Sequence, residues 1–427
     1  MNSTAEVTTP VPVKIAPKDI KLGYAIKLPV GWMKHPFLTN KLVVESAQQL
    51  RIILSLELDY VYFYPERSSV VVDSTADHNE ASVSRDIEDL QLRTQMQLEK
   101  EQRIEQAKAH RRELQKTEKA FAQSMAQVRN LMTKVQGRPL NAIEDASQLI
   151  SNLADTILSE DALVLHLISQ AGKEQESMYF HVLNVSILAM MLAKNLNYSA
   201  DEVKWTGLGA MFHDIGKLKI PSQILRKTSA LTTPELNFLK LHPKLGLELL
   251  GLTQQFPAEA KAIVEQHHEY LDGSGYPAAL KAGQINKLAR IVAVVNEFDN
   301  LCHPLDMSQA RSPHHALSLM YKTMKGKLGD LEMRVMIKMM GIYPPGTVVL
   351  LSDKRVGIVM AVNSDSMLYP DVLIYDADVP RLEAAIVTLE ANKLSVEKVV
   401  KPKALPPEVF AYLNPRAQIS YFVQQKN

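Results

Sequence analysis

The sequence predicts a multidomain α+β protein in which a central all-α domain is flanked by two small modules that contain strands. Three observations lead to this prediction. Short β-branched and aromatic segments occur in the first 72 residues and again after residue 343, apolar residues recur at helical spacing between about residues 140 and 340, and a highly charged segment separates the first module from the helical region. We expect four parts, at residues 1–80, 81–138, 139–342 and 343–427.

The first part is predicted to be a small α+β module and is a candidate sensor. Its short strand-like segments are interrupted by Gly and Pro, and they read VKIA, YAIKLPVGW and YVYFYP. Residues 45–57, ESAQQLRIILSLE, repeat apolar residues at helical spacing. We therefore expect one helix to pack on these strands.

The second part is predicted to be a long charged helix or coiled coil. Residues 82–134 are dominated by Glu, Gln, Arg, Lys and Ala, with few apolar positions. Two interpretations remain open, because the possible apolar seam contains several Gln and Arg residues. The helix is either a solvated connector or an element that forms a homodimer or carries a signal. Deletion of residues 1–134 is expected to leave the next domain folded.

The third part is predicted to be an all-α domain of about 200 residues, which is large enough to fold by itself. Its segments show the 3.6-residue period of buried helices, as in VLNVSILAMMLAKNL and ALSLMYKTMKGKL. After Tyr343 the pattern returns to short strands with Gly, Asn and Asp between them. The fourth part is therefore predicted to be a small β-rich appendage.

Composition limits the classes of function. The 427 residues carry a formal net charge of +1, so no global field attracts a nucleic acid polymer or an anionic membrane. Cys302 is the single cysteine, which excludes an intrachain disulfide and fits a reducing compartment. The first 20 residues lack an apolar signal core, and no segment approaches the ~20 apolar residues of a membrane span. We expect a cytoplasmic protein without a membrane span.

The α-domain contains many residues of the types that bind metals. His213 and Asp214 end an apolar helix, and residues 267–277 read HHEYLDGSGYP. Adjacent side chains on a helix diverge by about 100°, so they converge on one centre only through a bend or through the two oxygens of a bridging Asp. Imidazole and carboxylate ligands together suit iron, manganese or zinc better than magnesium. Five other histidines are interpreted as ordinary core or surface residues: His35, His166, His303, His314 and His315.

These segments resemble the HD-GYP family, a branch of the HD phosphohydrolase superfamily. Residues 213–217, HDIGK, match the family element HDxGK, and residues 267–277 match HHExxDGxGYP in full. The resemblance covers about residues 150–340. The first module is also similar to a domain of unknown function found in front of HD-GYP domains, and the β-rich tail is similar to the tail common in such proteins. The resemblance implies an HD-type helical domain and a metal-dependent phosphodiesterase that hydrolyses cyclic di-GMP to pGpG, and onward to GMP in some members.

The resemblance also implies a centre of two divalent ions, iron or manganese, with Asp214 bridging them. His181 and His213 then bind one ion, and His242 and the pair at residues 267 and 268 bind the other. Catalytic roles are implied for Asp214 and for Lys217, whose ammonium is expected to hold a phosphate oxygen. The alternative for Lys217 is a solvated lysine at a helix end. The full set of implied metal ligands is His181, His213, Asp214, His242, His267, His268 and Asn296.

The turn at the end of the second motif is a candidate surface for the substrate or for a diguanylate cyclase partner. Gly273 and Gly275 allow close approach of a ligand to the backbone, just before Tyr276 and Pro277. Two roles are open for Tyr276, which stacks on a guanine or fills a gap under the loop. A carboxylate beside a metal-bound His usually orients the imidazole, and we expect this role for Glu269 and Asp272.

Three departures from the family pattern limit the functional prediction. Asn296 occupies a position where the family has an Asp ligand, and an amide lacks the full negative charge of a carboxylate. Ser177 stands where some members have a Glu that builds a third metal position, and Glu176 lies off that helix face, so we expect two ions. Residues 302–307, CHPLDM, replace a basic stretch, for which Arg311 is a candidate substitute.

Three functional hypotheses remain after these departures. The first is a cyclic di-GMP phosphodiesterase. The second is a weak or inactive module that binds the nucleotide or a cyclase as a sensor or scaffold, and Asn296 favours it. The third is the same metal chemistry on another cyclic dinucleotide.

Overall fold

The computed structural model describes most of the chain, with gaps between the described segments. They are residues 12–37, 39–68, 82–135, 137–159, 166–168, 177–251, 255–306, 309–362, 366–381, 384, 386–390, 392–413 and 420–422. The chain divides into two compact units, residues 1–110 with 375–386 and residues 111–374 with 387–427. No described helix is both long enough and apolar enough to cross a membrane.

The N-terminal module is a four-stranded antiparallel sheet with one helix, as predicted. The strands are β1 (Val13–Ile15), β2 (Ala25–Lys27), β3 (Lys41–Val43) and β4 (Val61–Phe63), in the order β1-β4-β2-β3. Helix α1 (Ala47–Leu54) begins after Ser46, whose side chain accepts a hydrogen bond from the Gln49 amide. Its Ile52 and Ile53 are buried in the apolar core of this module.

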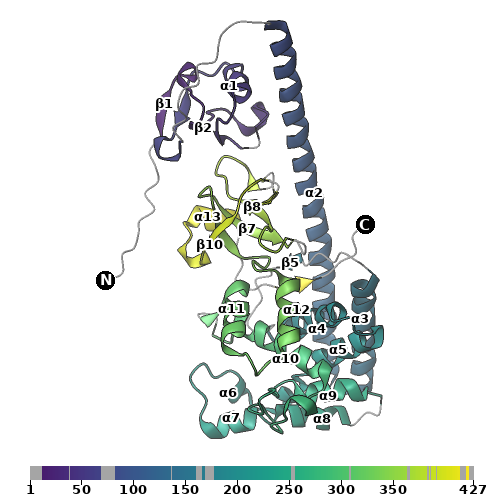
Figure 1. The fold of residues 1–427 in the computed structure, drawn as a ribbon. Coiled ribbons are helices and arrows are strands. Elements are labelled where there is room, and N and C mark those ends of the chain that lie inside the picture. Colours follow the sequence, from purple (N-terminus) through teal and green to yellow (C-terminus); the bar gives the residue numbers. More distant parts are fainter. Residues whose placement is uncertain are drawn as a thin grey trace, which may run out of the picture. The chain divides into compact units, whose positions relative to one another are not determined.

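Helix α2 (Ser82–Lys134) is one uninterrupted helix, as Figure 1 shows. It is more than an exposed connector, because it contributes to two cores. Near its start, Leu92 and Met96 pack against the core of the N-terminal module. Near its end, a stripe of apolar side chains is buried in the core of the helical domain, and its members are Phe121, Met125, Val128, Leu131 and Met132.

The helical domain is the all-α domain that the sequence predicted. Its helices are α3 (Pro139–Ser159), α4 (Ser177–Asn195), α5 (Ala200–Phe212), α6 (Ser222–Leu225), α7 (Thr233–Leu239), α8 (His242–Gly251), α9 (Ala258–Gln266), α10 (Lys287–Cys302), α11 (Pro313–Thr323) and α12 (Asp330–Met340). Capping boxes fix the starts of α5 and α7, through the pairs Ser199 with Glu202 and Thr232 with Glu235.

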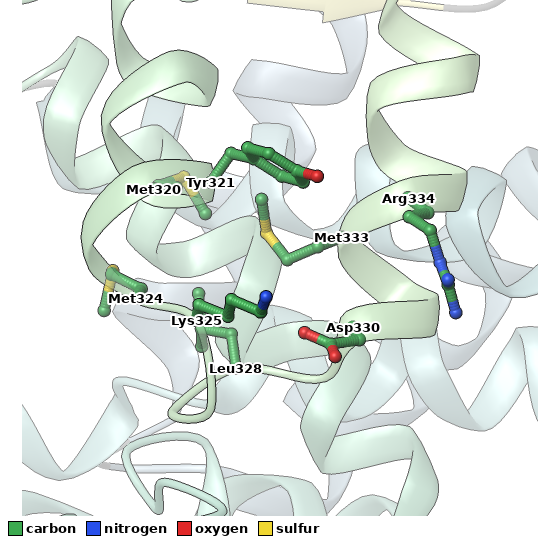
Figure 2. A pocket seen from close by; sticks show the side chains of 8 residues that line it. All are labelled: Met320, Tyr321, Met324, Lys325, Leu328, Asp330, Met333 and Arg334. Carbon is green, nitrogen blue, oxygen red and sulfur yellow. The ribbon is translucent and has the colours of Figure 1, made fainter.

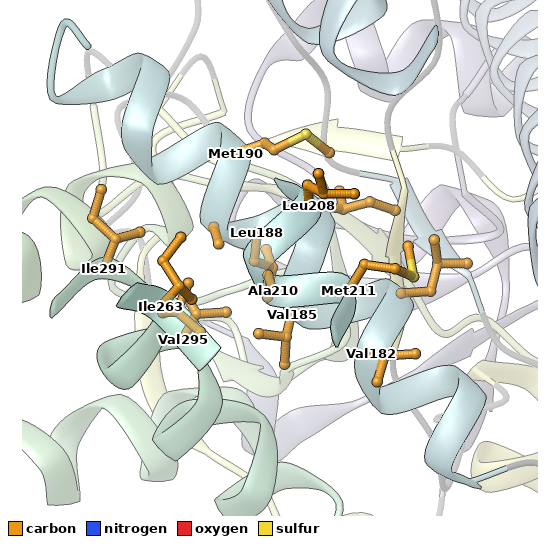
Figure 3. Packing of buried hydrophobic residues seen from close by; sticks show 14 of the residues in the cluster. Val182, Val185, Leu188, Met190, Leu208, Ala210, Met211, Ile263, Ile291 and Val295 are labelled. Carbon is orange, nitrogen blue, oxygen red and sulfur yellow. The ribbon is translucent and has the colours of Figure 1, made fainter. Parts of the chain in front are cut away.

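Helices α4, α5, α9 and α10 form the centre of the domain and pack against one another. Figure 3 shows Val185 and Leu188 of α4 together with Ala210 of α5, Ile263 of α9 and Val295 of α10 in one cluster. All five side chains are buried. This tight packing fixes the helix ends from which the candidate site is built.

The C-terminal part is rich in strands, as predicted, and consists of a five-stranded sheet followed by a short helix that was not predicted. Strands β6 (Val348–Leu351), β7 (Val356–Ala361), β8 (Asp371–Ile374), β9 (Ile386–Thr388) and β10 (Val396–Val399) lie in the order β10-β6-β7-β8-β9, and α13 (Pro407–Leu413) follows. The last strand, β11 (Ser420–Phe422), pairs with β5 (His166–Ile168) of the helical region.

Candidate metal centre

Six predicted ligands come together at the ends and inner faces of the central helices. His181 lies on α4, His213 caps the end of α5, and Asp214 follows it at the start of the 3-10 helix η5 (Ile215–Lys219). His242 begins α8, and His267 caps the end of α9, with His268 next to it. These residues form two groups that share Asp214, and the ligand atoms within each group all lie within 4.8 Å of one another.

The two groups differ in size. The first group contains His181, His213 and Asp214, and the second, larger group contains Asp214, His242, His267 and His268. Asp214 Oδ2 lies 3.4 Å from His213 Nε2 and 3.7 Å from His181 Nε2, whereas Oδ1 lies 3.3 Å from His242 Nε2. Each carboxylate oxygen therefore faces a different group of imidazoles.

Local backbone structure orients three of these imidazoles in the same way. The Nδ1–H groups of His213, His242 and His267 each donate to the carbonyl three residues earlier, at 2.7, 2.8 and 3.0 Å. These carbonyls belong to the last turn of a helix, where they lack partners within the helix. Because a carbonyl only accepts, Nδ1 carries the proton and Nε2 keeps a free lone pair toward Asp214.

Glycines at two positions permit the close packing behind the ligands. A Cβ on Gly216 would collide with the carbonyl group of His242 and the amide nitrogen of Gly246. The backbone of η5 therefore lies directly against the first turn of α8, and this contact brings Asp214 beside His242. A Cβ on Gly275 would collide with the backbone of residues 268–270.

The charge state of the buried groups suits a cation. Burial raises the pKa of the Asp214 carboxyl, but nearby charge, that of Lys217 first, outweighs this effect and holds the pKa well below its usual range. Burial lowers the pKa of His267 to about 3, and burial also places the pKa of His268 well below its usual range. At neutral pH these two imidazoles are uncharged, as metal ligands must be.

The donors fit a divalent ion of the transition series. Asp214 Oδ1 is buried and has no hydrogen-bond partner in the structure, and an unpaired buried carboxylate oxygen is costly unless a cation compensates it. The paired Nε2 atoms, 3.2 Å apart in both His181 with His213 and His242 with His267, present lone pairs to a common point. Imidazole nitrogens with a shared carboxylate are the ligands that iron, manganese and zinc accept.

The other predicted site residues have partners that the sequence did not reveal. The Lys217 ammonium lies 2.5 Å from Asp214 Oδ2. Asn296 is buried on α10, and its Oδ1 accepts a hydrogen bond from Asn300 at 3.1 Å. Arg311 is exposed, and the hydrogen bonds described for the six ligands do not involve its guanidinium. Ser177 is the first residue of α4, and Glu176 lies outside the described residues.

The expected role of Glu269 and Asp272 needs correction. Both oxygens of Glu269 accept from backbone amides, of Ala278 at 2.6 Å and of Leu280 at 2.9 Å. The Asp272 carboxylate accepts from the amide and hydroxyl of Ser274. These carboxylates hold the turn at residues 272–280 instead of orienting an imidazole.

The turn itself lies against the ligands. The amide of Tyr276 donates to the His268 carbonyl at 3.1 Å, and the two rings stack with centroids 4.6 Å apart. Gly273 adopts φ +80°, a conformation that favours glycine, and Pro277 follows the stacked tyrosine. Burial raises the pKa of Tyr276 far above its usual value, so the phenol keeps its proton. Tyr276 therefore supports the position of His268.

One buried carboxylate near the ligands was missed by the sequence analysis. Asp299 on α10 is 1% exposed, and its Oδ2 accepts from His181 Nδ1–H at 2.7 Å. The available signal was its position three residues after Asn296, on the same face of an apolar helix.

A separate cavity of about 140 Å³ lies between the end of α11 and the start of α12. Figure 2 shows Met320, Met324 and Met333 with Lys325 and Arg334 around it. None of the predicted site residues lines it. This cavity is therefore not part of the candidate centre.

A histidine–aspartate cluster on the ends of packed helices, with ligand atoms spaced so that they could hold metal ions, defines the class of the helical domain. Comparison with protein families gives the particular assignment: residues 141–330 match the family described as HD domain, and residues 13–146 match a domain of unknown function, DUF3391. The chain carries an HD domain preceded by this domain, as the motifs at residues 213–217 and 267–277 indicated.

Named relatives match part of the chain. A cyclic di-GMP phosphodiesterase of Pseudomonas aeruginosa is 31% identical over 230 residues, which are 54% of this chain and 55% of that protein. The 3′3′-cGAMP-specific phosphodiesterase 2 of Vibrio cholerae is 30% identical over 153 residues, 36% of this chain and 29% of that protein. The matched regions thus span about half or less of these relatives. A solved HDG"Y"P protein from Bdellovibrio bacteriovorus has a TM-score of 0.42 at 16% identity, and the match covers 77% of this chain and 99% of that chain.

Proposed function

We propose that this protein is a metal-dependent phosphodiesterase that hydrolyses cyclic di-GMP at a centre of two divalent ions, iron or manganese. The observation that carries the proposal is the position of Asp214, whose two oxygens face two separate groups of imidazole nitrogens. When bound, paired cations lower the pKa of a bound water, orient the phosphodiester and neutralise the charge that develops on its oxygens. The relative that hydrolyses cyclic di-GMP supports this choice of substrate.

Each ligand has a role in this proposal. His181 and His213 hold one ion, with Asn296 as a further ligand, while His242, His267 and His268 hold the other. Asp214 bridges the two ions. The hydrogen bonds at Nδ1 keep the ligand nitrogens directed inward before any ion arrives, so little reorganisation opposes binding.

Lys217 is proposed to hold a phosphate oxygen of the substrate. Its side chain is 29% exposed, and its ammonium lies beside Asp214 without being buried. A cation bound to Asp214 competes with the ammonium for the same oxygen, so Lys217 becomes available to an anionic ligand. Tyr276 and the turn around it also lie beside the centre, because the Tyr276 ring stacks on His268.

Products and partners extend the proposal. Hydrolysis of one phosphodiester gives linear pGpG, and hydrolysis of the second gives GMP. The turn at residues 273–277 is a proposed contact for a diguanylate cyclase, and helix α2 is a proposed homodimer contact. We place the protein in the cytoplasm, where the messenger is made and degraded. We keep the four parts predicted from the sequence, with the end of α2 included in the core of the helical domain.

Two other functions have specific support. Asn296 weakens one ion position, which favours a module that binds the nucleotide as a sensor or scaffold without turnover. The similarity to a 3′3′-cGAMP-specific enzyme favours a different cyclic dinucleotide as substrate. Both alternatives use the same residues as the main proposal. The products formed from each cyclic dinucleotide therefore distinguish the three functions.

The experiment compares the wild-type protein with Asp214→Ala. Metal content is measured after anaerobic purification, and each protein is incubated with cyclic di-GMP or 3′3′-cGAMP under added iron or manganese. We expect wild-type protein to form pGpG, and Asp214→Ala to lose bound metal and hydrolysis while circular dichroism stays unchanged, because both ions lose their shared anionic ligand. Wild-type activity in the variant excludes this centre. Binding without product supports the sensor function.

A further inference from the structure

Asp299 lies at the centre of a buried hydrogen-bond network that the proposed centre leaves without a role. Its Oδ2 accepts from His181 Nδ1–H at 2.7 Å, and its Oδ1 accepts from Asn184 Nδ2 at 3.2 Å and from His303 Nδ1–H at 3.0 Å. Burial raises the pKa of this carboxyl, but the imidazoles of His303 and His181 outweigh burial and lower the pKa below its usual range. Asp299 is therefore a buried carboxylate anion with donors on both oxygens.

Two packed helices create this network. His181 and Asn184 are three residues apart on one face of α4, and α4 packs against α10. His303 is the C-cap of α10, one turn after Asp299, and its backbone amide donates to the Asp299 carbonyl at 2.7 Å. His303 thus contacts Asp299 through both its backbone and its ring. It belongs to residues 302–307, where the sequence departs from the family pattern.

The network acts on one ligand. With its Nδ1 proton donated to Asp299, His181 directs Nε2 to within 3.2 Å of His213 Nε2 and 3.7 Å of Asp214 Oδ2. A carboxylate at the far nitrogen raises the basicity of a ligand imidazole and fixes its orientation. This is the ion for which the proposed further ligand is the neutral amide of Asn296.

We propose that Asp299 and His303 are positioning residues for the ion that His181 binds. Asp299 supplies, through the His181 imidazole, negative charge that Asn296 does not supply directly, and His303 holds the Asp299 carboxylate in place. This inference rests on the proposed metal centre, and it concerns metal affinity and not the identity of the substrate.

The test is a calorimetric titration of the metal-free, full-length protein with Mn²⁺. We expect Asp299→Asn to weaken the weaker Mn²⁺ site about 10–100-fold, the usual cost of losing an outer-shell partner, and to leave the tighter site unchanged. His303→Leu is expected to weaken the same site in the same direction. His303→Gln is expected to restore the affinity, because its amide nitrogen donates over a similar reach.

The control is Asp330→Asn, which removes an exposed carboxylate of the same domain and is expected to leave both Mn²⁺ affinities unchanged. Circular dichroism checks the fold of each variant, and the two His303 variants test the inference if Asp299→Asn does not fold. Unchanged affinity in Asp299→Asn overturns the role of Asp299. Equal affinities in His303→Leu and His303→Gln overturn the role of His303. If wild-type protein binds no Mn²⁺, the proposed centre itself fails, whereas binding without hydrolysis contradicts only the proposed activity.

Discussion

Three histidines at helix ends each have a structural role and a proposed ligand role in this site. His213, His242 and His267 each satisfy a carbonyl in the last turn of a helix through Nδ1, and each keeps Nε2 free. A buried carbonyl without a partner costs roughly 1–3 kcal/mol, so these histidines stabilise the fold even before they bind an ion. Structural and ligand roles of the same residue are therefore not separable by simple replacement with Ala.

Gly216 is the residue at which backbone packing and ligand position are most directly coupled. A side chain at this position meets the backbone of α8 at His242 and Gly246, which cannot rotate away. We expect Gly216→Ala to cost about 1–3 kcal/mol or more of unfolding free energy, the usual range for overpacking, and to weaken Mn²⁺ binding by displacing His242. Urea unfolding and calorimetry measure the two effects.

Gly251→Ala is the matched control for this change. Gly251 ends the same helix, α8, and a Cβ there meets no atom within 4 Å. We expect its unfolding free energy to change by no more than about 0.5 kcal/mol, as for most surface substitutions. An unchanged urea midpoint for Gly216→Ala would show that η5 moves to accept the methyl group.

The residue types of the candidate site were predictable, but their hydrogen-bond partners were not. His213 and Asp214 were identified from a motif, because residue type and spacing carry that information, and His181 was identified from the resemblance to the family. The partners of Glu269 are amides nine and eleven residues later, and the partner of His181 lies 118 residues away. Such contacts depend on the turn and on the packing of α4 against α10, which no local pattern encodes.

At the scale of elements, helix α2 passes through three different environments along its length. Near its start Leu92 and Met96 pack on the N-terminal module, most of the side chains that the structure describes between residues 101 and 119 are exposed, and its last turns are buried in the HD domain core. The buried residues Phe121, Met125, Val128 and Met132 recur at intervals of four, three and four residues, a seam pattern for helix packing. The sequence contained this stripe, but the charged composition of the whole segment obscured it.

This stripe changes where the chain can be divided. Deletion of residues 1–134 was expected to leave the helical domain folded, yet it removes five buried side chains of that domain's core. Burial of one such side chain contributes about 1.5–3 kcal/mol, so the loss is roughly 8–15 kcal/mol, as large as the whole stability of a domain. We now expect residues 135–427 to be unfolded or aggregated.

Residues 111–427 retain the complete stripe and are expected to fold and bind Mn²⁺. Thermal unfolding by circular dichroism and metal titration of the two fragments check this prediction. A cooperative transition for residues 135–427 at the temperature of the longer fragment would mean that the apolar face of α3 closes the core without α2.

At the scale of the whole molecule, the C-terminal tail is not a simple appendage. Its β-rich character was predicted from short strand-like segments with Gly, Asn and Asp between them, but its last strand, β11, pairs with β5 and packs against α4, the helix that carries His181. A pairing between residues 166–168 and 420–422 joins segments about 250 residues apart, and three-residue strands have no pattern strong enough to predict it. The tail thus contributes to the domain that holds the candidate centre.

The net negative charge that the proposed ligands offer to the two ions depends on whether residue 296 is an amide or a carboxylate. In the proposed arrangement Asp214 is the one carboxylate among the direct ligands, and it is shared between two cations. One group offers three imidazoles, of His242, His267 and His268, together with Asp214, whereas the other offers two imidazoles, of His181 and His213, together with Asp214. The further ligand proposed for the second group is the neutral amide of Asn296. We therefore expect wild-type protein to retain one ion tightly and to require added metal for the other.

Asn296→Asp tests this expectation, because the substitution adds a full negative charge in nearly the same shape. Asn296 is buried on α10, and the hydrogen bond from Asn300 to its Oδ1 is compatible with a carboxylate. We expect tightly bound metal to rise from about one to about two ions per chain, and the manganese or iron needed for half-maximal turnover to fall. Elemental analysis and rates across a metal titration measure both. The control is Asn197→Asp, which adds the same charge to an exposed position of the HD domain. Asn197 has a left-handed backbone conformation, which Asp also accepts. Two tightly bound ions in the wild-type protein, unchanged in Asn296→Asp, would mean that Asn296 is an adequate ligand or no ligand at all.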